Sequence, residues 1–494
     1  MSQENTLSAP GMTSEVRARI IAALGPGFAG RVTSPGDPDY DAARQVWNAM
    51  AGRRPGLIVR CASTADVVTA VNAARRFGLR PAVRGGGHNV AGRGTSDGGL
   101  VIDLSGMRGV TVREDALLVD VAGGARLADL DAATGPLGLV VPAGVMSETG
   151  IGGLALGGGI GWLSRRFGLT CDQFDSLEVV LADGSVVEVS GNSHPDLFWA
   201  LRGGGGNFGI VTRFTFRAHR FGPLMRLGVA LYEPRDARVA LQAYARILPG
   251  LPNLVGWQGV LLHAAGPLRF VPPELAGRPA LMLAAMWLGD PDDPAGAVQI
   301  GQLLAAAGPP AASADLTLPF ADVVQRLADA DFAAGHRYYT KEVHLAALPD
   351  EAIDKLIAFW AQMDSDGEVE LFHLGGAITD VPEDAAAFAH REHQLWLNLA
   401  LRWDDPARDA ACIAKARAAA EELRRWSGDG VYYNMINIDE DDRVVEALGG
   451  EKKYRRLASI KQRYDPDDLF GLHQGITAHR LDTFRPHPNR EESS

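Results

Sequence analysis

Residues 144–169 read GVMSETGIGGLALGGGIGWLSRRFGL, the longest glycine-rich stretch of the chain. Gly150, Gly152 and Ala155 could be fitted to the fingerprint of dinucleotide-binding sheets, but no strand-like run leads directly into them, so the parallel-strand context is missing. The chain contains no Gly-Lys pair, which excludes a phosphate-binding P-loop. The stretch instead predicts glycine turns whose backbone N–H groups meet an extended ligand such as a pyrophosphate.

A second glycine run stands at residues 81–92, where PAVRGGGHNVAG places His88 directly after three glycines. Glycine has no Cβ and lets the main chain approach a ligand closely, so the run predicts a cradle with an imidazole at its edge. The alternative is a flexible loop that ends on a surface histidine. A third run, Gly203 to Gly206, follows a helix-like segment and can equally be a helix C-cap and loop.

The composition excludes several classes of protein. The 494 residues suffice for two or three domains with a large buried core. The 48 basic residues stand against 60 acidic ones, a net charge of −12 without a long block of one sign, so we expect no nucleic-acid partner. Cys61, Cys171 and Cys412 lie far apart and form no CxxC pair, so we predict neither a disulfide framework nor a zinc site, which fits a reducing compartment.

The start of the chain and its apolar runs indicate where in the cell the protein is expected. Residues 1–20 contain an early acidic residue and no apolar core of secretory length, so we expect no signal peptide. Runs such as PALMLAAMWLG fall short of the roughly 20 apolar residues that a membrane-spanning helix needs. We therefore expect a cytoplasmic protein that does not associate with membranes.

Between about residues 55 and 220, short strand-like runs alternate with glycine turns. Asp183-Gly184 joins two runs whose apolar residues recur at alternate positions, which predicts a β-hairpin. Ser63 and Gly78 have the chemistry of an N-cap and of a residue just past a helix end, so they predict a helix between them.

The remaining chain differs in composition and in its pattern of apolar residues. From about residue 225 to 425 the glycine content falls, and alanine-rich helical stretches alternate with apolar runs, which indicates a separate domain. After about residue 426 comes a charged amphipathic helix, EKKYRRLASIKQRY, which Pro466 should stop.

Four blocks, in order and spread from about residue 50 to 480, resemble the berberine-bridge-enzyme-like branch of the vanillyl-alcohol-oxidase flavoproteins. They are RPAVRGGGHNVAG, GVMSETGIGGLALGGGIGWLSRRFGL, HPDLFWALRGGGGNFGIVTRFTFR and YRRLASIKQRYDPDDLF. The resemblance implies an α+β fold, in which a PCMH-type (p-cresol methylhydroxylase) FAD-binding domain of two α+β subdomains carries an inserted substrate domain. That domain should contain an antiparallel β-sheet flanked by helices.

The resemblance and the changes in texture together predict the division of the chain. It comprises an N-terminal segment (1–49), a first part of the FAD-binding domain (50–222), a substrate-binding domain (223–425), a C-terminal part that completes the FAD-binding domain (426–482), and a disordered tail (483–494).

The family joins the histidine of its GGH motif, here His88, covalently to the 8α-methyl of FAD. A neutral imidazole is a good nucleophile toward that electrophilic methyl group. The cofactor-binding residues that the resemblance implies are Arg84, Gly85, Gly86, Gly87, His88, Asn89, Gly144, Met146, Thr149, Gly150, Gly152, Gly153, Leu154, Gly159, Gly161, Ile210, Val211 and Asn434.

Departures from the family pattern are also informative. Many members form a second flavin bond through a cysteine where this chain has Met146, so we predict attachment through His88 only. Cys171 lies well downstream and is expected to be a small buried hydrophobe. Leu154 replaces a histidine, which removes a donor near the ribityl chain. Thr149 occupies a position associated with oxygen access, and it leaves oxidase and dehydrogenase behaviour open.

The catalytic base is not evident from the sequence. Asn398 stands where relatives present a glutamate or glutamine, and Met435 stands where many have a tyrosine or histidine, so neither can remove a proton. Asn398 could still orient a substrate hydroxyl. We predict Tyr433 as the base and Tyr339 as the second choice. Tyr339 lies in a separate stretch of sequence that also holds His336, Tyr338 and Lys341.

A tyrosine base would need its pKa lowered by a neighbouring cation, for which Lys341 and Arg337 are the candidates. If VYYNM is a regular strand, Tyr433 and Met435 share one face. The alternative to either tyrosine is a substrate acidic enough to ionise unaided, or water.

The stretch HREHQ, with His390, Glu392 and His393, has spacings that a metal site could use. No third kind of ligand stands nearby in the sequence, and FAHR resembles a loop of the family. We therefore assign no metal.

Three functions remain open at this point. The first is an FAD-dependent oxidase of secondary metabolism that moves a hydride to flavin N5 from a C–H bond next to an oxygen, nitrogen or phenol, with O₂ giving hydrogen peroxide. Its substrate would be a small polycyclic, phenolic or sugar-like molecule. The second is a flavin dehydrogenase with another electron acceptor, and the third is a flavin-binding protein without redox turnover. Substrate identity and oligomeric state stay open.

Overall fold

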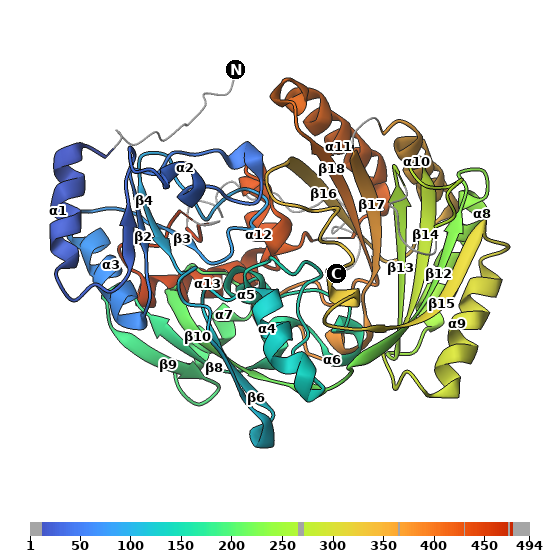
Figure 1. The fold of residues 1–494 in the computed structure, drawn as a ribbon, viewed down its shortest axis with the longest axis horizontal. Helices are drawn as coiled ribbons and strands as arrows, with labels where there is room; N and C mark the ends of the chain where they lie inside the picture. Colours follow the sequence, from blue (N-terminus) through green and yellow to red (C-terminus); the bar gives the residue numbers. More distant parts are fainter. Residues whose placement is uncertain (1–11, 265–270, 364–365, 429, 473–474, 478–494) are drawn as a thin grey trace.

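The structure is a computed structural model of the whole chain (Figure 1). The residues it describes are 12–264, 271–363, 366–428, 430–472 and 475–477. The tail predicted to be disordered, 483–494, lies outside these residues, so that expectation stays a prediction.

A small mixed sheet begins the fold, in the strand order β1-β2-β4-β3. The bounds are β1 (Arg31–Thr33), β2 (Leu57–Arg60), β3 (Ala82–Arg84) and β4 (Leu100–Asp103), with helices α1 (Ser14–Leu24), α2 (Tyr40–Ala43) and α3 (Thr64–Arg76) around them. Strand β4 runs parallel to both β2 and β3, so the chain crosses over through α3. The predicted helix start is confirmed, because the Ser63 side chain accepts a hydrogen bond from the Asp66 backbone N–H.

An antiparallel sheet follows, in the order β5-β6-β10-β8-β9. Its strands are β5 (Val110–Arg113), β6 (Leu118–Ala122), β8 (Phe174–Val180), β9 (Val186–Ser190) and β10 (Ile210–Arg217). The predicted hairpin is confirmed: β8 pairs with β9 around Gly184, whose φ of 85° favours glycine. A short pair, β7 (Leu139–Val140) with β11 (His219–Arg220), lies beside it.

Short helices carry the chain between these strands. They are α4 (Leu127–Thr134), α5 (Ile151–Leu156), α6 (Ser164–Phe167) and α7 (Pro195–Leu201). Helix α5 begins directly after Gly150 without a strand leading into it, so the missing parallel-strand context that argued against a Rossmann site is confirmed.

In the described part of the chain a seven-stranded antiparallel sheet, ordered β15-β12-β14-β13-β17-β18-β16, forms the other half of the molecule (Figure 1). Its strands are β12 (Leu224–Tyr232), β13 (Val255–Leu262), β14 (Ala280–Trp287), β15 (Ala312–Pro319), β16 (Arg337–Leu345), β17 (Asp366–His373) and β18 (Leu395–Trp403). Helices α8 (Ala237–Ile247), α9 (Pro294–Ala306), α10 (Asp350–Ala361) and α11 (Asp409–Leu423) cover one face.

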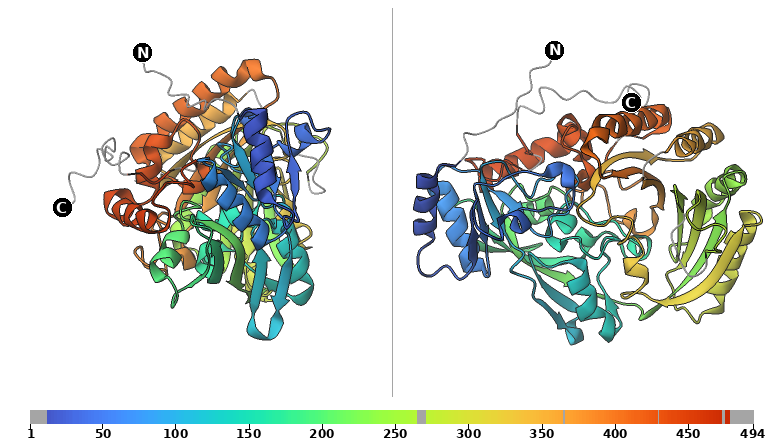
Figure 2. Two further views of the ribbon diagram at one scale, coloured as in Figure 1. Left: turned by 90° about the vertical axis from the view of Figure 1, so that its left-hand side faces the viewer. Right: turned by 45° about the horizontal axis from the view of Figure 1, so that its top comes forward.

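The pleat of this sheet decides what faces the first half of the molecule. Odd-numbered residues of β16, β17 and β18, such as Val343, Leu371 and Leu399, pack against the covering helices in one apolar core. Their even-numbered neighbours point to the opposite face, because side chains alternate along a strand. The predicted antiparallel sheet flanked by helices is therefore confirmed, and its uncovered face turns toward the glycine-rich half (Figure 2).

The C-terminal segment returns to the first half of the molecule (Figure 1). Helix α12 (Val444–Ala447) leads into α13 (Gly450–Tyr464), which packs on α7. The Lys461 ammonium group donates to the Asn207 carbonyl at 2.9 Å. The predicted amphipathic helix is thus confirmed, and it ends two residues before Pro466. The expected strand at VYYNM is wrong, since Tyr433–Met435 form a 3₁₀ turn.

Candidate functional site

A cavity of about 240 Å³ lies between the glycine-rich half and the uncovered face of the large sheet. Three backbone segments and that sheet face line it. The predicted cofactor-binding residues that line it are Arg84, Gly85, Gly86, Gly87, His88, Asn89, Gly144, Met146, Thr149, Gly150, Gly152, Gly153, Leu154, Ile210, Val211 and Asn434. Residues far apart in sequence therefore meet around one cavity.

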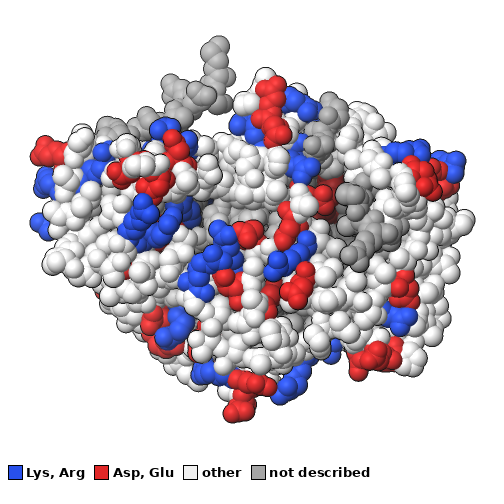
Figure 3. Space-filling view, viewed as in Figure 1, with Lys and Arg blue, Asp and Glu red and all other residues white. Residues whose placement is uncertain are grey.

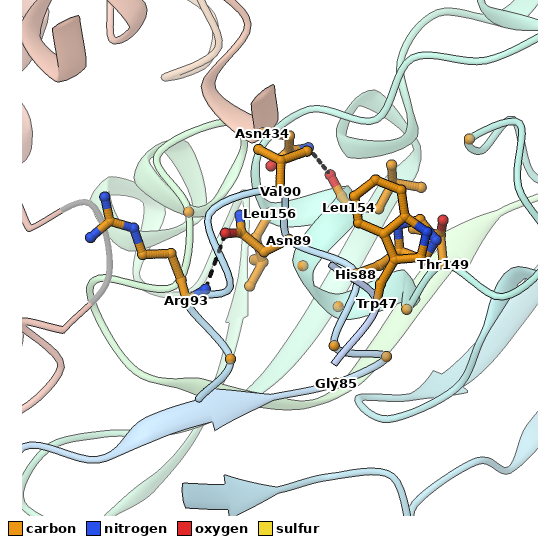
Figure 4. Close-up of a pocket in the computed structure, with 18 of the residues that line it drawn as sticks. Trp47, Gly85, His88, Asn89, Val90, Arg93, Thr149, Leu154, Leu156 and Asn434 are labelled. Carbon is orange, nitrogen blue, oxygen red and sulfur yellow. Dashed lines mark hydrogen bonds between the residues drawn. The ribbon is translucent and has the colours of Figure 1, made fainter. Parts of the chain in front are cut away.

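The first segment is the turn after β3, and glycine is required in it. A Cβ added to Gly86 would lie 2.4 Å from the backbone nitrogen of Gly150, so two turns touch main chain to main chain. Gly87 has a φ of 70°, which side-chain-bearing residues rarely adopt. The Asn89 carboxamide oxygen accepts from the Arg93 backbone N–H at 3.2 Å and closes the turn (Figure 4).

His88 lies at the end of this turn beside Trp47 (Figure 4). The two rings are stacked, with centroids 4.6 Å apart and planes inclined by 18°. Trp47 also stacks on Tyr338 at 4.0 Å and donates its indole N–H to the Phe332 carbonyl at 2.7 Å. Burial lowers the pKa of the His88 imidazole to about 4, so the ring is neutral at pH 7, the form that a nucleophile needs.

The second segment leads into α5. Gly150 and Gly152 both lie against main chain, since a Cβ on Gly152 would come within 2.8 Å of the Gly123 carbonyl oxygen. Gly153 differs, because a Cβ there would have no protein atom within 4 Å and would point into open space. The Asn434 carboxamide donates to the Leu154 carbonyl at 3.0 Å and joins the C-terminal segment to α5 (Figure 4).

Two predicted residues of this stretch are elsewhere: Gly159 and Gly161 are not among the described residues that line the cavity. The Gly159 N–H donates to the Tyr432 hydroxyl at 3.0 Å, and a Cβ there would meet the Thr170 hydroxyl. A Cβ on Gly161 would overlap the Ala143 carbonyl oxygen. At both positions glycine is needed because neighbouring protein atoms pack closely against the backbone, and not because the residue contacts the cavity.

The third segment is the loop after α7, which contributes Gly205, Gly206 and Gly209 to the cavity. The sequence does not single these residues out, because a helix C-cap accounts equally well for such a glycine run. The structure shows both features, since Gly203 has a φ of 121° just past the helix and the following glycines face the cavity.

The opposite wall is the uncovered sheet face, and it carries a carboxylate that the sequence analysis missed. Glu370 of β17 stands directly opposite Asn398 of β18, and Asn398 Nδ2 donates to Glu370 Oε2 at 2.6 Å. Both side chains line the cavity and both are buried. Burial raises the pKa of Glu370 to about 7, against the lowering effect of the hydrogen bond from Asn398.

A carboxyl group with that pKa is half ionised near neutral pH, which suits a proton acceptor. Asn398 lies where we expected it, beside the cavity and able to orient a ligand. The alternation of Glu368 and Glu370 with Val369 and Leu371 is a sequence signal for one polar strand face, but it does not distinguish a cavity wall from a solvent-exposed face.

Tyr339, the second choice for a base, lies on the other face of the sheet. It is not among the described cavity-lining residues, and its hydroxyl donates to Asp439 at 2.9 Å and accepts from Arg417 at 3.1 Å. Burial raises its pKa, whereas the prediction required a lower pKa. The proposed cations are also engaged elsewhere, Lys341 with Glu440 and Arg337 with Asp409. This geometry removes Tyr339 from the candidates.

Tyr433, the first choice, lines the cavity beside the glycine loop after α7. Its ring rests on the glycine loop, where a Cβ on Gly205 would come within 2.6 Å of it. Its hydroxyl accepts from Asn207 Nδ2 at 3.0 Å. Since Tyr433–Met435 form a 3₁₀ turn, the strand argument that placed Tyr433 and Met435 on one face does not hold. The geometry favours Tyr433 as a support for the loop.

The three cysteines and the histidine pair lie outside the lining of the cavity. Cys61, Cys171 and Cys412 are free and buried, so the absence of a disulfide and the burial of Cys171 are confirmed. The possible ligand atoms of His390, Glu392 and His393 all lie within 4.8 Å of one another. That spacing is within the range of a metal site, so the expectation of no metal there stays a prediction.

The surface agrees with the mixed charge of the sequence. Figure 3 shows acidic and basic side chains interspersed over one face, with a hollow near its centre. Within the part of the chain that the structure describes, every helix is too short or too polar to cross a lipid bilayer.

Comparisons with known proteins agree with this geometry. Residues 55–190 match the model of the FAD binding domain family, and residues 431–477 match the berberine and berberine-like family. The chain is 30% identical over 462 residues to (R)-6-hydroxynicotine oxidase of Paenarthrobacter nicotinovorans. The alignment covers 89% of this chain and 95% of that protein.

Two solved structures share the fold. The BBE-like 1 protein of Physcomitrella patens superposes with a TM-score of 0.80 at 21% identity, over 96% of this chain and all of that chain (100%). Glucooligosaccharide oxidase from Acremonium strictum, which carries a 6-S-cysteinyl, 8α-N1-histidyl FAD, gives a TM-score of 0.80 at 23% identity, over 93% of this chain and 98% of the other.

Proposed function

Because this chain belongs to the berberine-like family of FAD-linked oxidoreductases, we propose that it is an FAD-dependent oxidase of a small organic molecule. It oxidises a C–H bond next to an oxygen, a nitrogen or a phenol and uses O₂ as the electron acceptor, with hydrogen peroxide as the second product. The observation that carries the proposal is the arrangement of the cavity, with glycine turns and a neutral histidine on one side and a carboxylate with a pKa of about 7 on the other.

The residues present fit an FAD. The segments at Arg84–Asn89 and Gly150–Leu154 and the glycine loop at Gly205 expose backbone rather than side chains to the cavity, as a pyrophosphate and a flat ring system require. The open space beside Gly153 is a place that a ligand could fill. We propose that His88 is the only covalent attachment, since Met146 lacks a thiol at the position of the second bond in relatives.

FAD bound here would accept a hydride from the substrate and pass electrons on to O₂. The protein's own part in that chemistry lies on the sheet wall. Glu370 accepts the proton that the substrate heteroatom releases, and the low dielectric of the cavity keeps its pKa close to working pH. Asn398 holds the carboxylate by its Nδ2 and can orient the substrate by its Oδ1. The aromatic and aliphatic residues around them exclude water.

The proposal is tested by an anaerobic screen of alcohols, amines and phenols that follows bleaching of the flavin absorbance. The expected result is bleaching by at least one compound class, followed by recovery of the oxidised spectrum and release of hydrogen peroxide when air is admitted. Bleaching that recovers only with an added dye would instead show a dehydrogenase. A flavin that no compound bleaches would contradict redox turnover.

A further inference from the structure

Three histidines from two separate segments of the chain meet at one end of the large sheet. His344 is the penultimate residue of β16, and His390 and His393 lie in the turn that precedes β18. The His393 ring centroid lies 5.0 Å from that of His344 and 5.7 Å from that of His390. None of the three is among the described residues that line the main cavity, so this histidine cluster is separate from the proposed flavin site.

A carboxylate joins the histidine cluster from the solvent side. The possible ligand atoms of His390, Glu392 and His393 lie within 4.8 Å of one another. Glu392 is exposed, His390 is half-buried and His393 is buried, so the group runs from the surface inward. An ion could therefore reach the histidines from solvent by passing Glu392.

The His344 ring is the observation that points to a ligand. The residue is 4% exposed, and in the described structure neither its Nδ1 nor its Nε2 has a hydrogen-bond partner. Buried polar atoms are nearly always paired, because an unpaired one has lost its hydrogen bonds to water. Unpaired ring nitrogens beside two further imidazoles are what a site for a lone-pair acceptor, such as a metal ion, would present.

The second nitrogens of two rings have the partners that metal-bound histidines use. His390 Nε2 lies 2.8 Å from the Glu446 carbonyl oxygen. A carbonyl only accepts, so Nε2 carries the hydrogen and Nδ1 keeps a lone pair. Nε2 of His344 lies 3.8 Å from Glu342 Oε2, which also lacks a partner in the described chain. Metal-bound histidines usually donate their other N–H to such a carbonyl or carboxylate, which fixes the ring.

Glycines of the loop after α11 pack directly on the rings. A Cβ on Gly428 would lie 2.5 Å from His393 Cε1, and a Cβ on Gly430 would lie 2.4 Å from His390 Cγ. The Gly428 N–H also donates to the His344 carbonyl at 2.9 Å. The backbone of this loop therefore holds the imidazoles in place at close range, so they need little rearrangement to bind an ion.

Two arginines lie next to the histidine cluster, and acidic partners neutralise both. Arg391, inside the HREHQ stretch, binds both carboxylate oxygens of Asp172. Arg443, whose charge acts on His344, pairs with Glu446 at 3.0 Å. A divalent cation at the histidines therefore meets no unpaired positive charge from these two residues.

We propose that His344, His390 and His393, with Glu392 at the surface, form a structural site for a zinc ion. Three imidazole nitrogens and one carboxylate oxygen are a full tetrahedral set for Zn²⁺, whereas Mg²⁺ and Ca²⁺ prefer oxygen ligands. The ion would join β16 to the turn before β18, independently of the flavin chemistry. The HREHQ stretch alone predicts no metal, because the third histidine is distant from it in sequence.

The test uses untagged, flavin-containing protein that is treated with EDTA and then separated from the chelator. Titration calorimetry at pH 7.5 should show one zinc ion per chain, with no competition from excess Mg²⁺. Zinc should raise the melting temperature, because the assembled site exists only in the folded protein. X-ray absorption of the zinc-loaded wild type should show imidazole scattering and first neighbours at about 2.0–2.1 Å.

Two histidines of similar backbone conformation form a matched pair of variants. His390 and His194 have φ values of 64° and 51°, a region that asparagine tolerates. His390→Asn should weaken zinc binding at least about tenfold, and His344→Gln should weaken it by a similar factor. His194 is exposed and lies outside the cluster, so His194→Asn should leave zinc binding unchanged. Melting temperatures in EDTA report on folding.

The possible outcomes decide the inference without reference to catalysis. Absence of zinc binding by the wild type, or equal binding of Mg²⁺, would overturn it. Zinc binding that neither His390→Asn nor His344→Gln weakens would place the ion elsewhere and would also overturn it. If a variant does not fold, the absorption spectrum of the wild type still tests the site. Imidazole scattering around one tightly bound zinc supports the inference, and a spectrum without it overturns the inference.

Discussion

Asn398 Nδ2 donates a hydrogen bond to Glu370 Oε2 over 2.6 Å, between directly opposed residues of two antiparallel strands. The amide stabilises the ionised carboxylate, while burial favours the protonated one, and burial is the larger effect. The Glu370 carboxyl group therefore titrates near neutral pH, and the Asn398 amide lowers its pKa.

The first prediction is a pH dependence of flavin reduction. A base works only when deprotonated, and the pKa of Glu370 is raised to about 7, so the rate should fall as pH drops below 7 and level off above it. Glu370→Gln should remove this limb and slow reduction at least about a hundredfold, roughly 2.7 kcal/mol of barrier. Stopped-flow reduction at several pH values measures both. An unchanged rate in the variant would return the role to Tyr433 or to the substrate itself.

The second prediction concerns the amide. Asn398→Leu removes the hydrogen bond that lowers the pKa of Glu370, so the fall in rate should begin at higher pH. The plateau rate should also drop, because the substrate loses the Asn398 oxygen that orients it. Flavin content should be normal, because Asn398 belongs to the sheet wall and not to the glycine turns. If the reduction rate falls at the same pH in wild type and variant, ionisation of Glu370 does not cause the pH dependence.

The third prediction concerns attachment of the cofactor. Acid-denatured wild-type protein should keep its flavin, and His88→Ala should release it, since His88 is the only side chain assigned to the bond. Met146→Cys places a thiol in the cavity lining, and we expect a second linkage detectable by peptide mass. Flavin retained by denatured His88→Ala would show that another residue forms the bond.

The fourth prediction uses the open space beside Gly153. Gly153→Ala meets no protein atom within 4 Å, and alanine favours a helix over glycine, so the melting temperature should not fall. The methyl group enters the cavity, so flavin content should fall. Gly301→Ala, in the exposed face of α9 and equally free of contacts, is the matched control and should leave flavin content unchanged. Full flavin content in Gly153→Ala would place the cofactor away from α5.

The fifth prediction concerns a buried ion pair that joins the two halves of the chain. Arg391 binds both carboxylate oxygens of Asp172, at 3.0 and 2.7 Å, with side chains 3% and 6% exposed. Arg391→Ala leaves a buried carboxylate poorly paired and should cost about 3 kcal/mol. Arg455→Ala breaks an exposed pair with Glu451 and should cost at most about 1 kcal/mol. Equal losses in denaturant unfolding would contradict the burial argument.

The turns and helices of the glycine-rich half could be predicted because local chemistry determines them. Ser63 caps a helix and Gly184 closes a hairpin whatever the rest of the chain does. Gly159 and Gly161 show the limit of this reasoning. They stand in the same glycine-rich stretch as Gly152 and Gly153, and only tertiary packing decides which glycines face the cavity.

The sheet wall could not be predicted for a related reason. Glu370 sits in a strand of alternating polar and apolar residues, and the same pattern would arise if that face met solvent. The place of Tyr433 in the C-terminal segment favours it as a base, but a 3₁₀ turn directs its side chain to the glycine loop. The family resemblance predicts where the cofactor belongs. Which side chains face it from the sheet depends on side-chain direction along the strands, and that could not be predicted.

The junction of α13 with the glycine loop has a consequence for how the protein is made. Lys461 reaches the Asn207 carbonyl, and Asn434 reaches α5, so the last part of the chain closes a site begun more than two hundred residues earlier. At ribosomal speeds the intervening sheet takes roughly 10 to 40 s to synthesise. During that time the glycine turns stand without their cover, so the finished cavity forms only after the C-terminal segment has been made.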